Sequence, residues 1–499
     1  MGVQTRPNGR TGRRAAAFVV AVVALVVVTV GRTAVAAPVL PISPGLPTAG
    51  GSAQPVAVQR AATAKVADLI GKGSINDTGT RWGVEGTDLG HMFMVGSKMA
   101  MTFGDTFGAP AAQDFYSVAH GDWRSNVIAS IDPPLTPALG LRFRGMITDR
   151  PGHAKELIAS KKVKGVQETV IPTYGIATGA NNATMNLQYM SVQSFDQPGH
   201  WRLTGSGIAT STDGGVTWKD QPAARWPANS KFGQVAYVRP GGPDDPKAPV
   251  PAGSTPGDTV YVYGIPGGRY GDLSLAKVPA AQLTEAAAYR YWNGSTWVAG
   301  EANATPVIKG PVGELSVRWS SYYKQWIMMY LVDDTGEIVL RTAPAPTGPW
   351  SAAQVVTTTK EFPKAYAPYL TPRWNDGPDL WFTMSQFTTY RVELMRTRLQ
   401  VLPAGASVPA ADQPQSLSAR SPSLSAPPLP QAAASPTTTT APTAPATTTT
   451  APGSTTAAQV APAAATPSTV STVSSPAPPA TPTTAAAGSG SSPPAAASG

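Results

Sequence analysis

The chain has 499 residues, of which 13% are charged, and its formal net charge is +9. It has no cysteine, which excludes disulfides, thiolate catalysis and cysteine-based metal sites. Only four histidines occur, and no pair has the spacing of ligands on a helix, so we expect no metal site and no cofactor.

Residues 1–36 are predicted to be a secretory signal peptide. A head with four arginines precedes the apolar run of residues 15–30, and residues 34–36 (AVA) fit a cleavage site. An uncleaved anchor and a twin-arginine signal at residues 13–14 are the alternatives. The leader holds five arginines and no acid, so its removal lowers the net charge from +9 to +4. The charge therefore gives no argument for nucleic-acid binding, and we expect no membrane association after cleavage.

Residues 58–400 are predicted to form one all-β domain. Short apolar runs alternate with Gly, Pro, Asp and Asn turns, and helical periodicity is scarce. In the clearest unit, three strands and a fourth after "TGPWS" fit within residues 314–355, which is typical of one propeller blade. The same rhythm recurs in five units, at residues 86–131, 168–218, 233–298, 314–355 and 366–399. The sequence thus predicts a five-bladed β-propeller, and residues 64–71 could supply the missing fourth strand of the last blade.

The stretch "GTDLGHMFMVGSKMAMTFGDTF" (86–107) is predicted to be a hairpin that turns at Gly96-Ser97. This register pairs Val95 with Lys98, Phe93 with Ala100, His91 with Thr102 and Asp88 with Asp105. Opposed residues share one face, and two carboxylates there repel each other. Repulsion raises one pKa and leaves the other group ionised, which suits an acid and a base. The alternatives are that both aspartates are turn residues, or that a one-residue bulge separates their faces.

One local motif lies outside this hairpin. Residues 211–218, "STDGGVTW", fit the Asp-box pattern S-x-D-x-G-x-T-W. In propellers this pattern forms a turn between the outer strands of a blade, so we interpret Asp213 and Trp218 as structural. A sialidase signature is the weaker interpretation, because such turns lie away from active sites.

The first strand of each propeller blade lines the central channel. The residues at or beside the starts of the five first strands are Asp88, Glu168, Gln234, Glu314 and Tyr366. Carboxylates that converge in a wide cleft suit glycoside hydrolysis, in which one protonates the leaving oxygen and another activates water or attacks the anomeric carbon. We therefore predict Asp88, Asp105 and Glu314 as catalytic residues, with Glu168 behind them. The alternative for both glutamates is a solvated strand end.

A sugar cleft also needs flat apolar faces and hydrogen-bond donors. The aromatic candidates near inferred strand ends are Trp82, Trp123, Tyr174, Tyr263 and Trp319. Arg124, Asn126 and Arg318 are candidate donors to hydroxyl groups. The alternative for each of these side chains is packing within the protein.

Residues 401–499 consist almost entirely of Ala, Pro, Thr, Ser and Gly. Such a segment buries too little apolar surface to offset its ordering entropy, so it is predicted to be disordered. Its Thr- and Pro-rich runs are typical of an extended, O-glycosylated stalk that spans a cell wall. A plain solvated tail is the alternative.

Several stretches together resemble the domain-of-unknown-function family 4185 over about residues 60–400. They are "RWGVEGTDLGHMF", "FGDTFG", "WRSNVIAS", "ETVIPTYGI", "GELSVRWSSYYKQWIMMYL" and "LRTAPAPTGPWS". The resemblance implies a five-bladed propeller and an endo-acting D-arabinanase of the glycoside hydrolase class. It implies cell-wall arabinan as substrate, and it matches the paired aspartates of the family to Asp88 and Asp105. The tail after residue 400 lies outside the family domain.

The expected function is therefore that of a secreted, monomeric glycoside hydrolase of the cell envelope. It would cleave internal α-D-arabinofuranosyl linkages of arabinogalactan or lipoarabinomannan. A non-catalytic propeller that binds wall glycan or a partner protein is the first alternative. A sialidase-like enzyme is the second, although Arg124, Arg239 and Arg318 do not form the arginine pattern it requires.

Overall fold

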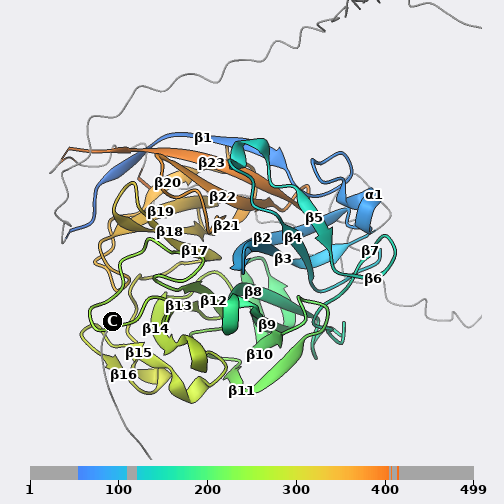
Figure 1. The fold of residues 1–499 in the computed structure, drawn as a ribbon, viewed down its shortest axis with the longest axis horizontal. Helices are drawn as coiled ribbons and strands as arrows, with labels where there is room; N and C mark the ends of the chain where they lie inside the picture. Colours follow the sequence, from blue (N-terminus) through green and yellow to red (C-terminus); the bar gives the residue numbers. More distant parts are fainter. Residues whose placement is uncertain (1–53, 109–120, 404–405, 407–412, 415–499) are drawn as a thin grey trace, which may run out of the picture. The chain divides into compact units, whose positions relative to one another are not determined.

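A computed structural model describes residues 54–108, 121–403, 406 and 413–414. The predicted signal peptide (1–36) and most of the predicted tail (401–499) lie outside the described residues. The described part forms five antiparallel sheets around a common centre, which confirms the expected all-β, five-bladed propeller (Figure 1). No helix among these residues is long and apolar enough to cross a membrane.

The five blades follow one another along the chain, and each begins with its innermost strand. Blade 1 consists of β2 (Gly86–Val95), β3 (Lys98–Phe107), β4 (Val127–Ile131) and β5 (Phe143–Met146). Blade 2 consists of β8 (Thr169–Thr178), β9 (Thr184–Gln197), β10 (His200–Ser211) and β11 (Lys219–Pro227). Blade 3 has five strands, β12 (Gln234–Val238), β13 (Thr259–Ile265), β14 (Ser274–Pro279), β15 (Arg290–Trp292) and β16 (Trp297–Val298).

Blade 4 consists of β17 (Leu315–Ser320), β18 (Gln325–Val332), β19 (Glu337–Ala343) and β20 (Gln354–Thr357), close to the prediction for this unit. Blade 5 consists of β21 (Ala365–Leu370), β22 (Asp379–Gln386), β23 (Arg391–Val401) and β1 (Val58–Asp68). Outside the blades, the described residues form the short hairpin β6 (Thr148–Arg150) and β7 (His153–Ala154), the helix α1 (Thr78–Trp82) and five 3-10 turns. These turns are η1 (Pro137–Leu139), η2 (Ala180–Asn182), η3 (Ala280–Gln282), η4 (Ala286–Ala288) and η5 (Glu301–Asn303).

The N-terminal strand closes the ring of blades. β1 pairs antiparallel with β23 along almost its whole length, so the start of the domain completes a blade built from its end. Thr63 and Thr397 are hydrogen-bonded through their hydroxyls at 2.9 Å, and Arg60 Nη1 lies 2.8 Å from Glu361. The prediction that this N-terminal segment contributes the fourth strand of the last blade is confirmed for residues 64–68, although the strand begins earlier, at Val58, and ends at Asp68 instead of residue 71.

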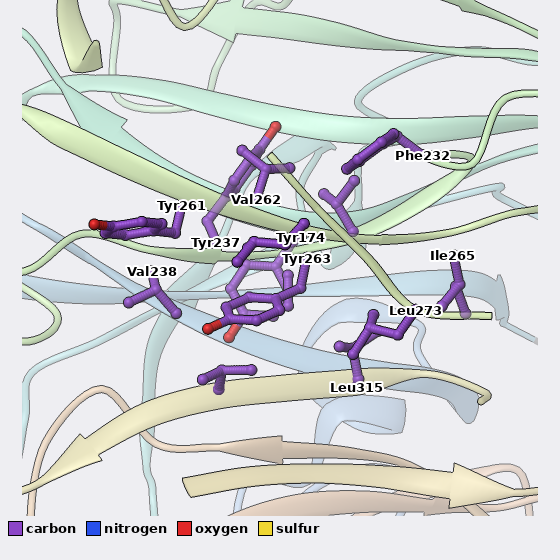
Figure 2. Close-up of a cluster of buried hydrophobic side chains, with 14 of the residues drawn as sticks. Tyr174, Phe232, Tyr237, Val238, Tyr261, Val262, Tyr263, Ile265, Leu273 and Leu315 are labelled. Carbon is purple, nitrogen blue, oxygen red and sulfur yellow. The ribbon is translucent and has the colours of Figure 1, made fainter. Parts of the chain in front are cut away.

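The inner strands are buried on both faces, because each lies between two neighbouring blades. All residues of β8, β12 and β21 are buried. Tyr174 of β8, Tyr237 of β12, Tyr263 of β13 and Leu315 of β17 belong to one cluster that joins blades 2, 3 and 4 (Figure 2). Strands of this kind appear in a sequence as almost continuous apolar runs, which is why the first strands were recognisable.

The five inner strands form a closed ring around the channel. β2 contacts β8 and β21, β12 contacts β8 and β17, and β17 contacts β21. Since each second strand runs antiparallel to the first, the connection from the second to the third strand returns to the end where the first strand starts. We call this end the mouth. It comprises the starts of the inner strands and the second-to-third-strand connections, of which the described parts are residues 108 and 121–126, 198–199, 266–273, 333–336 and 387–390.

The turn at residues 211–218 lies between β10 and β11, the third and fourth strands of blade 2, and hence at the end away from the mouth. Asp213 accepts hydrogen bonds from the Thr217 backbone N–H at 3.0 Å and from Ser211 Oγ at 2.8 Å. The bonds from Thr217 hold the pKa of Asp213 far below its usual range. Trp218 Nε1 donates to the Gly215 carbonyl at 2.9 Å.

Candidate active site

The β2–β3 hairpin has the predicted register, with one local irregularity. Strand pairing joins Val95 with Lys98, Phe93 with Ala100 and His91 with Thr102. The ladder shifts at Leu89, whose φ is +65°, and resumes in the original register with Thr87 opposite Thr106. Asp88 and Asp105 are the next residues along the two strands, but Asp88 lies in the shifted stretch and does not pair with Asp105. The prediction that the two aspartates oppose each other on one face is therefore wrong, because the Asp88 carboxyl lies on the Gly104 side of β3 and the side chain of the next residue, Asp105, points to the other side. A Cβ atom at position 104 would lie 2.4 Å from Asp88 Oδ1, so Gly104 provides the space in which the Asp88 carboxyl lies against β3.

Asp88 faces blade 5 and is held as an acid. Tyr366 of β21 donates its hydroxyl hydrogen bond to Asp88 Oδ2 at 3.0 Å. Asp88 keeps partial contact with solvent, but protein atoms surround its carboxyl group closely. This burial, together with the charges of Asp105 and Glu314, raises the pKa of Asp88 to about 8, against the opposing effects of Tyr366 and Arg269. At neutral pH, Asp88 is therefore mostly protonated.

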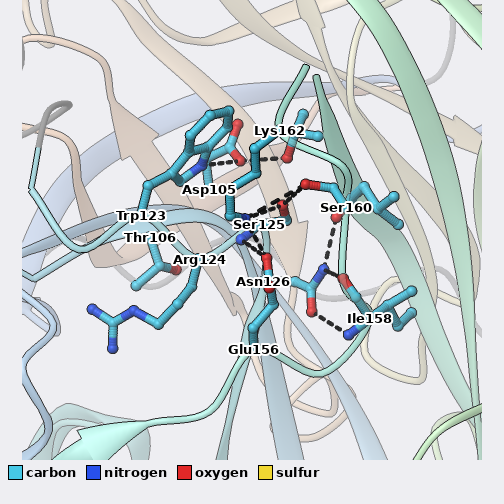
Figure 3. A network of polar contacts seen from close by, with 12 residues as sticks. Asp105, Thr106, Trp123, Arg124, Ser125, Asn126, Glu156, Ile158, Ser160 and Lys162 are labelled. Carbon is cyan, nitrogen blue, oxygen red and sulfur yellow. Dashed lines mark hydrogen bonds and ion pairs between the residues drawn. The ribbon is translucent and has the colours of Figure 1, made fainter. Parts of the chain in front are cut away.

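Asp105 faces blade 2, and its surroundings favour the ionised form more than those of Asp88 do. Its Oδ1 accepts hydrogen bonds from Trp123 Nε1 at 2.8 Å and from Thr169 Oγ1 at 2.5 Å (Figure 3). Only 8% of Asp105 is exposed. Burial raises its pKa to about 6, although both hydrogen bonds and the positive charge of Lys162 act in the opposite direction. Asp105 is therefore mostly ionised at pH 7, where Asp88 is not.

Glu314 lies at the start of β17 and is bound by Arg269. The guanidinium donates to Glu314 Oε1 through Nη2 at 2.8 Å and Nε at 3.0 Å, and through Nη1 to Asp333 at 3.0 Å. The same guanidinium lies 5.0 Å from the ring centroid of Tyr366, the residue that holds Asp88. Arg269 thus connects Glu314 with the surroundings of Asp88, through the connection between β13 and β14.

Three carboxyl oxygens at the mouth are buried and have no hydrogen-bond partner within the described residues. They are Asp88 Oδ1, Glu168 Oε2 and Glu314 Oε2, at or next to the starts of three inner strands. Burial is also the main cause that raises the pKa of Glu168, whose charge in turn acts on Asp105. A buried acceptor without a partner costs about 1–3 kcal/mol. These oxygens at the mouth are therefore available for hydrogen bonds with a ligand.

Two predicted hydrogen-bond donors, Arg124 and Asn126, are bonded to the protein itself, and Figure 3 shows the bonds of Asn126. Arg124 donates to the carbonyls of Gly83 and Ala154, the latter at 3.0 Å. Asn126 donates to the carbonyls of Ile158 and Val170 at 2.8 and 2.7 Å, and its Oδ1 accepts from two backbone N–H groups. Both side chains are buried and hold blade 1 to the segments around it. Their contact with substrate stays a prediction.

Arg318 and Tyr174 fill the channel beyond the mouth. Arg318 is 2% exposed and forms an ion pair with Asp245 at 3.1 Å. Its guanidinium lies 5.7 Å from the ring centroid of Tyr174, which stacks on His91 at 5.4 Å. Four residues of strand separate Arg318 from Glu314, or roughly 13 Å along the channel. The structure therefore does not bring Arg318 to the carboxylates.

The other three predicted aromatic residues pack against other parts of the protein. Trp82 is buried beside Phe143, Tyr263 donates its hydroxyl to the Pro346 carbonyl at 2.7 Å, and Trp319 packs against Trp326. No hydrogen bond or ring contact in the described residues joins these three to Asp88, Asp105 or Glu314. Their role in substrate binding also stays a prediction.

Sequence reasoning named Trp123 in the connection between β3 and β4, but it missed the site residues that lie in the other second-to-third-strand connections. Arg269 and Asp333 lie in such connections, and Tyr390 lies in another. Burial and the charge of Asp88 raise the pKa of the Tyr390 hydroxyl. Thr169 was overlooked although it follows Glu168 directly. Once five blades are assigned, topology places all these connections at the mouth, so that signal was present in the strand pattern.

Comparison with known protein families identifies the family to which this chain belongs. The sequence model described as domain of unknown function, DUF4185, matches residues 73–396. The chain belongs to the DUF4185 family. The match covers all the inner strands and every carboxylate discussed above. Within the described part of this DUF4185 protein, no group of three or more His, Cys, Asp or Glu side chains is arranged to hold a metal ion.

Two curated fungal proteins are similar to this DUF4185 chain. Notoamide biosynthesis cluster protein J of Aspergillus sp. (strain MF297-2) is 30% identical over 355 residues, covering 67% of this chain and 88% of that protein. Notoamide biosynthesis cluster protein J' of Aspergillus versicolor is 29% identical, with 67% and 89% covered. These names refer to a biosynthetic gene cluster and do not name a reaction.

Among solved structures, a putative hydrolase from Bacteroides ovatus ATCC 8483 has a TM-score of 0.43 and 14% identity, covering 64% of this chain and 87% of that chain. An exo-beta-1,3-galactanase from Phanerochaete chrysosporium has a TM-score of 0.39 and 10% identity, with 70% and 67% covered. An alpha-L-arabinofuranosidase from Podospora anserina has a TM-score of 0.38 and 10% identity, with 70% and 99% covered. The latter two are glycoside hydrolases by name. These TM-scores and identities are too low to indicate a reaction for the DUF4185 chain, so its chemistry is inferred from its own side chains.

Proposed function

We propose that this protein is a secreted glycoside hydrolase that cleaves internal α-D-arabinofuranosyl linkages of cell-wall arabinan. Asp88 is the general acid and Asp105 is the ionised partner. Glu314, fixed by Arg269, supports the pair and accepts a hydroxyl hydrogen bond from the substrate. The protein acts in the cell envelope as a monomer.

The observation that carries the proposal is the difference in pKa between the two aspartates, which their different surroundings produce. The pKa of Asp88 is raised to about 8 and that of Asp105 to about 6, so one is protonated and the other ionised between these values. Glycoside hydrolysis needs this combination, because one carboxyl group protonates the leaving oxygen while the other acts at the anomeric carbon. Buried acids of this kind weaken the fold, which argues against a purely structural role.

In the proposed reaction, Asp88 transfers its proton to the glycosidic oxygen as the bond to the anomeric carbon breaks. Asp105 either attacks that carbon directly or deprotonates the water that attacks it. Trp123 and Thr169 keep Asp105 oriented and ionised through their hydrogen bonds. The partnerless oxygens of Glu168 and Glu314 accept sugar hydroxyls, which removes their desolvation cost when substrate binds, while Asp88 Oδ1, the oxygen that Tyr366 leaves free, carries the proton that is transferred.

Substrate and location rest on sequence features. Arabinan as substrate follows from the resemblance to arabinan-cleaving members of the family, because carboxylates alone do not select one polysaccharide. Secretion follows from the leader at residues 1–36, and the wall location from the Ala-, Pro- and Thr-rich tail at residues 401–499.

The test is incubation of the full-length chain with arabinogalactan and, separately, with a panel of other glycans. We expect arabino-oligosaccharides from arabinogalactan only, and none from Asp88→Asn or Asp105→Asn. Asp376→Asn is the matched control, because this exposed aspartate lies between β21 and β22, away from the mouth, and forms an ion pair with Lys247. NMR of the first product assigns retention or inversion. Intact polymer under all conditions would favour a glycan-binding module instead.

A further inference from the structure

An aromatic pair stands on the rim of the mouth, between blades 2 and 3. The rings of His200 and Tyr270 stack at 4.1 Å between centroids with an angle of 2° between their planes. His200 is exposed, and Tyr270 is 37% exposed, one of the few large side chains of the described residues so open to solvent. Two parallel rings in contact with water form a flat, partly apolar surface that packs nothing in the core.

The protein holds this pair rigidly. The Arg269 backbone N–H donates to the Gly199 carbonyl at 2.9 Å, which joins the connections of blades 2 and 3. The Tyr270 hydroxyl donates to Asp333 Oδ2 of blade 4 at 2.9 Å. A Cβ at position 199 would lie 2.6 Å from that carboxylate oxygen and 2.8 Å from Tyr270 Cε2, so only glycine permits this close approach. Three blades thus fix the orientation of one exposed ring.

A continuous line of contacts leads from the pair to the acid. The Arg269 guanidinium lies 5.4 Å from the ring centroid of Trp201 and 5.0 Å from that of Tyr366. It binds Asp333, the partner of Tyr270, on one side and Glu314 on the other. Tyr366 then contacts Asp88. The rim and Asp88 are therefore joined by one network of side-chain contacts.

We propose that the His200–Tyr270 pair, with Trp201 and Arg269, forms a sugar-binding subsite for a ring of the polysaccharide some residues away from the bond that is cleaved. The inference rests on the proposed function for the identity of the polymer. Flat rings stack on the apolar faces of sugars, and the nearby carboxylates accept hydroxyl hydrogen bonds. Arg269 faces both Glu314 and Asp333, so the cluster has a net negative charge and favours neutral over acidic sugars.

The subsite is tested by comparing a long substrate with a short one. For Tyr270→Ala and His200→Ala, we expect kcat/KM on arabinogalactan to fall about ten-fold, as for the loss of one stacking contact. On an arabinofuranosyl disaccharide, too short to reach the rim, we expect no change. Tyr322→Ala is the matched control, because Tyr322 is a half-buried tyrosine in the turn between β17 and β18, at the opposite end of the channel. Thermal unfolding verifies that each variant is folded.

A binding readout separates this inference from the proposed function. Gel electrophoresis through arabinogalactan measures binding of Asp88→Asn with and without Tyr270→Ala. Retardation that Tyr270→Ala abolishes supports the subsite even if the wild-type protein cleaves nothing, a result that would refute only the hydrolase. Unchanged retardation and unchanged polymer cleavage would overturn the subsite alone. Equal losses on the long and short substrates would also overturn it, because they would place the ring at the cleavage point.

Discussion

Replacing Thr169 by valine removes one hydrogen bond from Asp105 with almost no change of shape. Thr169 Oγ1 lies 2.5 Å from Asp105 Oδ1 in a fully buried position. A hydrogen bond to a charged group contributes about 1.5–3 kcal/mol. The protonated form of Asp105 keeps part of this hydrogen-bond energy, so only the remainder shifts the pKa. Because one pKa unit corresponds to about 1.36 kcal/mol, we expect the pKa of Asp105 to rise by about one unit. Trp123 still holds the carboxylate in place.

The sign of the effect on activity follows from the role of Asp105. Its ionised form is needed, so activity falls as the pH decreases through its pKa, which is about 6 in the native protein. A rise of one unit lowers the ionised fraction about five-fold at pH 6 and about two-fold at pH 7. The alkaline limb, set by Asp88 with a pKa of about 8, stays where it is.

The assay is the pH dependence of kcat/KM on arabinogalactan for the wild type and Thr169→Val. Thr173→Val is the matched control, since Thr173 lies on the same strand and its hydroxyl contacts the Gln188 carbonyl at 3.4 Å instead of a carboxylate. An acidic limb that does not move, or an alkaline limb that moves with it, would refute the assignment of Asp105 as the ionised partner.

The remaining predictions concern pH and stability. The wild-type profile should be bell-shaped with its maximum near pH 7, midway between the pKa values of about 6 and about 8; a maximum near pH 4 would contradict both assignments. Because the folded-state pKa of Asp88 is raised to about 8, only the unfolded chain releases this proton between about pH 4 and pH 8, and the free energy of unfolding falls over that range. Calorimetry should therefore show Asp88→Asn stabilised by on the order of 2 kcal/mol at pH 8 and scarcely at pH 4. Asp213→Ala should lower Tm modestly and leave the pH profile unchanged, since its turn lies away from the mouth; a shifted profile would contradict this. Deletion of residues 58–68 should abolish cooperative unfolding, because blade 5 loses its outer strand; an unchanged Tm would show that the closure is dispensable.

Local patterns predicted the fold because antiparallel hairpins pair neighbouring segments. The strands of residues 314–342 and the pairing of His91 with Thr102 depend on nearby turns and on alternation. Even the closing strand was predictable, because an apolar run without a local partner has to pair elsewhere. The shift at Leu89 was expected only as the bulge alternative, because local patterns do not show contacts between blades, such as the close approach of Val392 in blade 5 to Gly90, whose added Cβ would lie 2.7 Å from it.

Side-chain roles were less predictable, since they depend on contacts between blades. Asn126 has the chemistry of a sugar-binding group, yet four bonds to backbone groups of distant segments occupy its amide. Arg318 was expected near the carboxylates, but Asp245, from another blade, holds it deep in the channel. Asp88 and Asp105 both lie at the mouth because one hairpin carries them, but the shift at Leu89 places them on opposite faces, which the turn residues did not indicate.

The central claim is that Asp88 supplies a proton and Asp105 does not. The most direct test compares Asp88→Asn and Asp105→Asn on arabinogalactan and on a 4-nitrophenyl glycoside of an arabinofuranosyl oligosaccharide, whose leaving group needs no proton. We predict that Asp88→Asn loses activity on the polymer but keeps most of it on the aryl glycoside, while Asp105→Asn loses both. Equal losses of Asp88→Asn on the two substrates would contradict the role of Asp88 as the acid.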